Sequence, residues 1–156
     1  MSRSALVRFV FLVAAATVLT GSVASAVGPL QYFSVTPCRV VDTRTATGIT
    51  GGPPLAAFQT RNFPMRGFCG ISSTAVAVAL NVTVVTPGSD GYLTLWPSGT
   101  TQPTVSTINF TPADPALANG AIVPMAAAMS SMEIAVFNGS PGATNLILDV
   151  TGYFAP

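Results

Sequence analysis

Apolar and polar residues alternate along most of the chain after residue 30, and this alternation predicts β-strands. In the segment TAVAVALNVTVV, large apolar residues occupy every second position from Val76 to Val84, with Ala, Asn and Thr between them. The segment NLILDVTGYF repeats the pattern and places Asp149 and Tyr153 on its outward face. One large apolar face and one smaller, more polar face are typical of strands that cover a core on one side only.

Turn-forming residues divide this pattern into short strands, whereas helical periodicity is nearly absent. Only AAAMSSM at 126–132 could form a helical turn. We expect strands at 31–35, 38–44, 55–63, 74–86, 91–97, 104–110, 120–125, 132–137 and 144–154. A parallel sheet would need crossover helices, for which the chain has no room. The pattern therefore predicts an all-β fold, a single antiparallel β-sandwich or flattened barrel of about eight or nine short strands.

The first 26 residues have the three-part pattern of a secretory signal peptide. Arg3 and Arg8 flank the start of an apolar run, FVFLVAAATVLT, and the tripeptide ASA follows as a cleavage signal before Val27. An uncleaved anchor is the alternative, but the run is short for a membrane span. We expect residues 27–156 to form one secreted or extracellular domain, in part associated with the cell surface, with no transmembrane span.

The mature chain is nearly uncharged. Removal of the first 26 of 156 residues leaves 130, which suits one domain with a core of its own. Four arginines then stand against five acidic residues, so the net charge is −1, and the sequence has no lysine and no histidine. A chain without a basic stripe or patch does not favour nucleic acid or anionic lipid as a partner.

Two cysteines, Cys38 and Cys69, remain in the mature chain. One pair in an exported domain most simply forms a disulfide, which would stabilise the fold by about 3–4 kcal/mol. A zinc site is the weaker interpretation, because two thiolates without a histidine supply only half of the usual ligands.

The segment PCRVVDTR concentrates charge in a chain that has little of it. Strict alternation places Asp42 on the same face as Cys38, and we expect that face to point inward because half-cystines are usually buried. A buried Asp42 needs a donor, which Arg39, Arg44 or the backbone N–H groups of the following turn would supply. We predict a structural clamp that pins the first strand and the loop at 45–56; a ligand site and a catalytic cluster stay open as alternatives.

The absence of histidine argues against most hydrolytic mechanisms. It excludes Ser-His-Asp and Cys-His arrangements and histidine-based metal hydrolysis, and no glycine-rich phosphate loop is present. A carboxylate pair could still hydrolyse a glycoside, and alternation places Glu133 and Asp149 outward, where carboxylates are usually solvated. We therefore expect no enzyme activity and no cofactor.

Calcium is a further alternative. Asp90 and Asp114 lie in turn sequences, where carboxylate and carbonyl oxygens converge, but the spacing DxDxDG does not occur. We do not expect a structural calcium ion.

The segment GYLTLWP predicts an aromatic surface. If Leu93 and Leu95 fill the core, Tyr92 and Trp96 point away from it, and Phe137 or Tyr153 supplies a third ring on the same side. Aromatic rings flanked by Asn and Thr would suit stacking against sugars. Packing under a loop, or contact with another copy of the domain, explains the same pattern.

Six segments in this order resemble a repeated extracellular module: PCRVVDTR, AVALNVTVVTP, GYLTLWPSG, STINF, ANGAIVPM and DVTGYF. The module occurs in exported proteins of actinobacteria, acidobacteria and related groups, alone, in tandem or attached to secreted hydrolases. The resemblance extends from about Phe33 to Phe154. It implies an all-β cell-surface or secreted accessory domain and no particular reaction.

Low charge and uncovered strand edges both favour association between protein copies. We therefore expect a non-catalytic structural or adhesive β-module that assembles with itself or with other surface proteins. A carbohydrate-binding module that holds polysaccharide on its aromatic surface is the alternative.

Overall fold

The computed structural model describes residues 28–127 and 130–156. The predicted signal peptide lies outside these residues, and so does part of the segment 126–132 for which a helical turn was expected. Every regular element among the described residues is a β-strand, and none of them belongs to a helix able to span a membrane.

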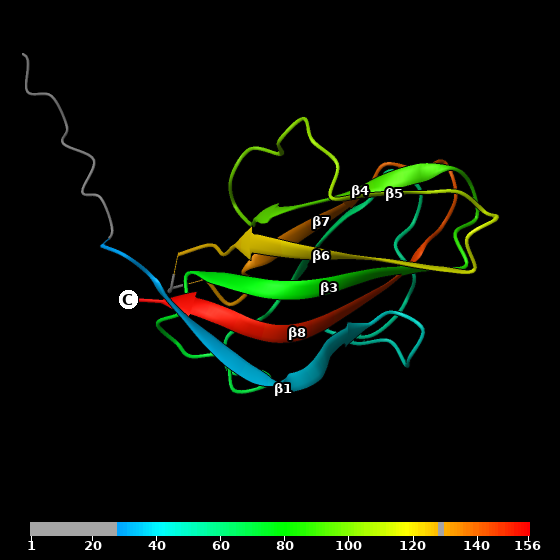
Figure 1. Ribbon diagram of the computed structural model, residues 1–156. Helices are drawn as coiled ribbons and strands as arrows, with labels where there is room; N and C mark the ends of the chain where they lie inside the picture. The colour runs from blue at the N-terminus through cyan, green and yellow to red at the C-terminus, as the bar shows by residue number, and fades with distance from the viewer. Residues whose placement is uncertain (1–27, 128–129) are drawn as a thin grey trace, which may run out of the picture.

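Eight antiparallel strands form two four-stranded sheets, which confirms the predicted β-sandwich (Figure 1). The first sheet has the order β1-β8-β3-β6 and the second sheet the order β2-β7-β4-β5. The strands are β1 (Gln31–Asp42), β2 (Thr60–Phe63), β3 (Ala77–Val85), β4 (Gly91–Pro97), β5 (Ile108–Phe110), β6 (Ala116–Pro124), β7 (Ile134–Asn138) and β8 (Asn145–Ala155).

Several predicted boundaries differ from the structure. The predicted strand 104–110 is regular only from Ile108 to Phe110, and the strand predicted at 120–125 begins earlier, at Ala116. The segments 31–35 and 38–44 belong to one strand, β1, because β1 stays paired with β8 on both sides of an irregularity. The predicted strand 55–63 is shorter, since Leu55 makes only an isolated bridge to Thr144 before β2 begins at Thr60. Loop residues therefore occupy much of a segment whose composition resembles that of a strand.

The core lies between the sheets and is formed by the alternating apolar residues. Val78 and Val82 of β3, Leu148 of β8, and Leu93 and Val136 of the second sheet are fully buried. Neighbouring residues on β3, such as Asn81 and Thr83, are half-buried on the outer face. The alternation in TAVAVALNVTVV thus describes the inner and outer faces of β3.

A β-bulge in β1 overturns the face predicted for Asp42. The register shifts between Arg39 and Val41, and both Val40 and Val41 are buried. One extra residue in a strand reverses the alternation that follows it. Asp42 therefore pairs with Ile147 on the outer face of the first sheet, the face on which Arg39 also lies.

A second irregularity, between β3 and β8, overturns the face predicted for Tyr153. The register shifts between Ala79 and Leu80, opposite Thr151. After the shift, Tyr153 pairs with Val78 and packs against the core, and its ring stacks on Phe33 with 5.3 Å between the ring centroids. In addition, β8 and β4 belong to different sheets, so Tyr153 does not share a surface with Tyr92.

The predicted disulfide is confirmed. Cys38 in β1 is bonded to Cys69 in the loop between β2 and β3, with 5.8 Å between the Cα atoms. Cys69 packs against the core cluster, so the bond fixes that loop under the first sheet. Closing a loop of about 30 residues stabilises a domain by about 3–4 kcal/mol in the chain-entropy model.

Candidate functional site

The outer face of the second sheet is divided between a covered part and an open part. Leu93 and Leu95 belong to the core cluster, so Tyr92, Thr94 and Trp96 point to the opposite side of β4, as the alternation predicts. The loop 98–107 then folds back over that side. The Thr94 hydroxyl donates to the Val105 carbonyl at 2.8 Å, and the Thr107 amide donates to the Leu93 carbonyl at 2.7 Å.

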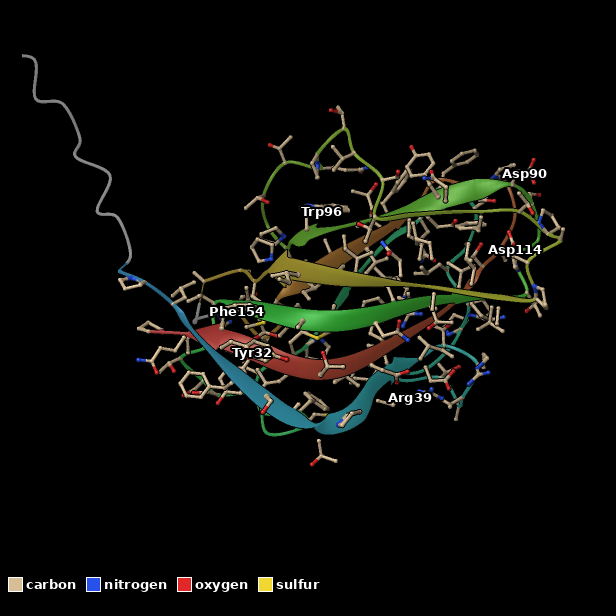
Figure 2. The ribbon with its side chains drawn as sticks, in the orientation of Figure 1. Tyr32, Arg39, Asp90, Trp96, Asp114 and Phe154 are labelled. Atoms are coloured by element: carbon tan, nitrogen blue, oxygen red, sulfur yellow. A yellow bond between two sulfur atoms is a disulfide. The ribbon has the colours of Figure 1, made fainter. Side chains whose placement is uncertain are left out.

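This loop buries Trp96, which is only 7% exposed. Its indole Nε1 donates to the Thr100 carbonyl at 3.1 Å, so the ring is satisfied by the loop that covers it. Figure 2 shows Trp96 at the end of β4, where the loop begins. The prediction of Trp96 as a surface aromatic is therefore wrong, because strand alternation gives the direction of a side chain and not what folds over it.

Tyr92 remains at the surface and is 37% exposed. One face of its ring lies against Gly139: a Cβ carbon added there would be 2.3 Å from Tyr92 Cζ and 2.5 Å from Cε1. The Phe137 ring is tilted against it, with 6.1 Å between the centroids. The structure thus brings together two of the four aromatic residues expected on this surface, and the Tyr92 ring is fixed by its neighbours.

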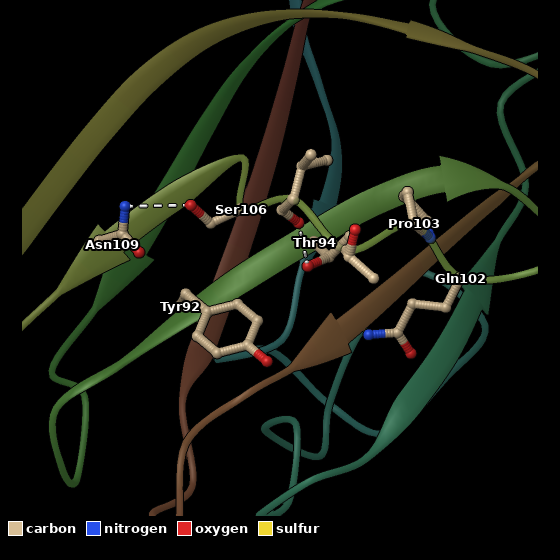
Figure 3. Close-up of a pocket in the computed structure, with 8 residues that line it drawn as sticks. Tyr92, Thr94, Gln102, Pro103, Ser106 and Asn109 are labelled. Carbon is tan, nitrogen blue, oxygen red and sulfur yellow. Dashed lines mark hydrogen bonds between the residues drawn. The ribbon is translucent and has the colours of Figure 1, made fainter.

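A groove of about 570 Å³ opens beside the Tyr92 ring (Figure 3). Strand β4 contributes one wall, and the loop 98–107 with the start of β5 contributes the other. The lining residues are Tyr92, Thr94, Gln102, Pro103, Thr104, Val105, Ser106 and Asn109. The Asn109 amide donates to the Ser106 hydroxyl at 3.1 Å, which orients both groups along the rim.

The groove combines apolar surface with uncharged polar groups. Its lining includes two amides, Gln102 and Asn109, and several hydroxyls, but no carboxylate, guanidinium or thiol. Such a site donates and accepts hydrogen bonds and offers a ring for stacking. It contains no pair of groups suited to general acid–base catalysis. Its lining can therefore exchange hydrogen bonds with uncharged polar groups.

The cluster in PCRVVDTR forms on the outer face of the first sheet, close to Asp149. The Asp42 carboxylate accepts bonds from Arg44 Nε at 2.8 Å and Nη2 at 2.6 Å, and from Arg39 Nη1 at 3.3 Å. Arg39 also donates two bonds to Asp149, at 2.8 and 3.1 Å. Both arginines are exposed, whereas the Asp42 side chain is only 11% exposed.

These contacts shift the pKa values in the direction expected of ion pairs. The Arg44 side chain, and then its backbone N–H and the nearby charges, lower the pKa of Asp42 from 3.8 to about 2, against the opposing effect of burial. Hydrogen bonding to Asp149 raises the pKa of Arg39. Together with Asp149 of β8, the segment therefore forms a small charge network on the surface, with two positive and two negative groups.

A more deeply buried ion pair joins Arg66 and Glu133. Glu133 is 3% exposed, and its carboxylate lies 3.4 Å from Arg66 Nη1 and accepts a 2.6 Å bond from the Met65 amide. The prediction that Glu133 projects outward into solvent is wrong: Glu133 immediately precedes β7, and Met65 and Arg66 of the loop after β2 contact its buried carboxylate. Glu133 and Asp149 lie on different sheets and do not form a carboxylate pair.

The turn residues Asp90 and Asp114 lie at the same end of the sandwich (Figure 2). The Asp114 carboxylate accepts bonds from the Thr111 amide at 3.0 Å and from the Thr111 hydroxyl at 3.1 Å, so it closes its own turn. In the part of the chain that the structure describes, no three metal-ligating His, Cys, Asp or Glu side chains gather.

The groove residues on the loop were missed from the sequence. The segment SGTTQPTVST at 98–107 carries polar, uncharged residues, and the sequence predicted a connection that passes into a strand at residue 104, whereas β5 begins only at Ile108. Its excess of amide and hydroxyl groups was the available signal, but only the folded loop places them opposite Tyr92. Comparisons with protein-family models, curated proteins and solved structures found no match for this chain.

Proposed function

We propose that this protein is a secreted, non-catalytic adhesive module that binds polysaccharide through the groove beside Tyr92. The observation that supports this most is the Tyr92 ring, held flat on Gly139 with part of it exposed beside uncharged amides and hydroxyls. An aromatic ring of this kind contributes about 1 kcal/mol beyond the area that it buries.

The fixed ring lowers the cost of binding. Gly139 and Phe137 restrict Tyr92 before any ligand arrives, so little side-chain entropy remains to be lost. One ring with a few hydrogen bonds gives weak affinity for a single chain segment. Strong adhesion would then depend on many copies that bind the same polysaccharide.

Binding to insoluble cellulose and chitin, and retardation in gels that contain soluble polysaccharides, test this function directly. Tyr92→Ala should lose the binding, whereas Phe68→Ala, which removes another exposed aromatic ring, in the loop between β2 and β3 and outside the groove lining, should keep it. Equal binding by wild type and Tyr92→Ala would exclude the groove as the site. Secretion is tested separately, by N-terminal sequencing of the exported chain, which should begin at Val27.

Assembly of identical copies is a second candidate function, and strand β6 supports it. This nine-residue edge strand of the first sheet carries no charged residue and exposes 65% of Ile122. Uncharged edge strands invite pairing with a further strand. Light scattering over a concentration series should show association that Ala118→Lys abolishes; a monomer at every concentration would exclude it.

A further inference from the structure

A second depression, of about 490 Å³, lies on the outer face of the first sheet, on the other side of the sandwich from the groove beside Tyr92. Figure 2 shows Arg39, which lines this depression, and Tyr32, which is hydrogen-bonded to Thr151 beside it. The lining residues are Pro37, Cys38, Arg39, Asn81, Asp149 and Thr151.

The irregularities of the first sheet all border this depression. Strand β1 shifts register between Ser34 and Cys38 and again between Arg39 and Val41. Strand β8 has an extra residue, Thr151, where its pairing with β3 shifts. The other pairings among the described strands are regular. Bulges re-aim side chains and are enriched next to binding sites, so three of them at one place indicate a shaped surface.

Three polar side chains cross the depression in one row. Arg39 of β1 pairs with Asp149 of β8, which in turn pairs with Asn81 of β3. Neighbouring strands are about 4.8 Å apart, so successive polar side chains of the row are separated by about this distance. This interval is comparable with the length of one pyranose ring, which allows successive sugar hydroxyls to meet successive side chains.

The row has hydrogen-bonding capacity to spare and no net charge. Arg39 and Asp149 neutralise each other through two bonds, and each Asp149 oxygen can accept another. The Asn81 amide makes a single 3.4 Å bond to Thr83, and the Thr151 hydroxyl a single 3.4 Å bond to the Ala79 carbonyl. A balanced row of this kind suits neutral hydroxyl groups better than phosphate or another anion.

An aromatic ring again lies beside the polar groups. Tyr32 is 50% exposed, its ring covers Gly152, and its hydroxyl donates to the Thr151 carbonyl at 3.2 Å. A Cβ carbon at Gly152 would lie 2.4 Å from Tyr32 Cζ, so this tyrosine rests on a glycine as Tyr92 does on Gly139. The two faces of the sandwich therefore repeat one arrangement: a tyrosine fixed on a glycine beside amide and hydroxyl groups.

We propose that this depression is a second sugar-binding site, for a neutral oligosaccharide, and that the domain joins two polysaccharide chains. The choice of a sugar as ligand rests on the proposed function, but the site itself rests on its own residues. Because the two sites lie on opposite faces, one chain cannot fill both by lying flat on the protein, and binding at both cross-links separate chains.

Chemical-shift mapping on the ¹⁵N-labelled secreted chain tests this with three probes: cellohexaose, mannohexaose and N-acetylchitohexaose. At least one probe should shift amide signals near Asn81 and Thr151 in addition to those near Tyr92. Asn81→Ala and Thr151→Val should each weaken the affinity measured from the signals near Asn81 and Thr151 about tenfold, as expected for the loss of one or two hydrogen bonds. The affinity measured from the signals near Tyr92 should stay unchanged. Thr151 is exposed, so Thr151→Val keeps the test valid if Asn81→Ala does not fold.

The outcomes separate the two proposals. Shifts confined to the Tyr92 groove would overturn the second site and leave the proposed function standing. Shifts confined to Asn81 and Thr151 would support the second site and overturn the role of the groove, and no shift with any probe would overturn both. Turbidity of the matching soluble polysaccharide should rise with wild type, should not rise with Tyr92→Ala, and should need about tenfold more protein with Thr151→Val, because cross-linking needs both sites.

Discussion

The Tyr92 ring occupies the space that a side chain at Gly139 would fill, since a Cβ carbon there would lie 2.3 Å from Tyr92 Cζ. Gly139 follows β7, and its amide donates to the Tyr92 carbonyl at 2.9 Å, so the backbones are joined where the ring lies flat. Glycine is required here for close approach rather than for backbone freedom. The relationship fixes the one aromatic ring that borders the groove.

Gly139→Ala should therefore displace the Tyr92 ring and lower the free energy of unfolding by about 1–3 kcal/mol, as overpacking does. Urea denaturation measures the change. In a Tyr92→Ala background the same substitution should cost far less, because the clash has been removed. Gly120→Ala is the control, since no atom lies within 4 Å of the added carbon. Equal costs in both backgrounds would contradict the contact.

Trp96→Ala should lower the free energy of unfolding by about 3–5 kcal/mol, because it leaves a cavity under the loop 98–107. Trp96→Phe should cost less, since it retains most of the volume but loses the bond to Thr100. Thermal unfolding gives the order of the two variants. A wild-type melting temperature for Trp96→Ala would mean that the loop leaves the ring uncovered in solution.

Glu133→Ala should be the most damaging change to a charged residue, at about 3–5 kcal/mol, because it leaves the buried Arg66 without its partner. It also removes the acceptor of the Met65 amide. Asp42→Ala, whose arginine partners are exposed, should cost only about 1 kcal/mol. Chemical denaturation of both variants under one condition compares them. A larger loss for Asp42→Ala would reverse this ranking and restore the segment PCRVVDTR as the main clamp.

Asp42 should also make stability depend on pH in the acid range. Its pKa in the folded protein is about 2, below the ordinary 3.8, so folding favours the ionised carboxylate. The stabilisation is complete well above pH 3.8 and is lost as the pH falls from there toward 2. The difference in melting temperature between wild type and Asp42→Asn should therefore shrink over this interval. A constant difference would show that the charge of Asp42 contributes nothing.

The sequence by itself determined the local, repeating features of this protein. Alternation predicted the β-sandwich and the inner faces of β3 and β4, since successive side chains of a strand point to opposite sides. Two cysteines in a chain with a predicted signal peptide predicted the disulfide between Cys38 and Cys69. These features depend on neighbours along the chain, or on the simplest pairing of two residues, and the composition was sufficient to find them.

Tertiary structure decided which faces of the strands are exposed to solvent, and which residues from distant parts of the chain lie together on them. The bulges that turned Asp42 outward and Tyr153 inward each add a residue to one strand, a change that the alternation in the sequence does not reveal. The loop that buries Trp96 and the turn that buries Glu133 also lay outside the pattern, because burial depends on what packs against a side chain from elsewhere in the chain. For the same reason, the polar loop residues became candidates for a site only when folding placed them opposite Tyr92.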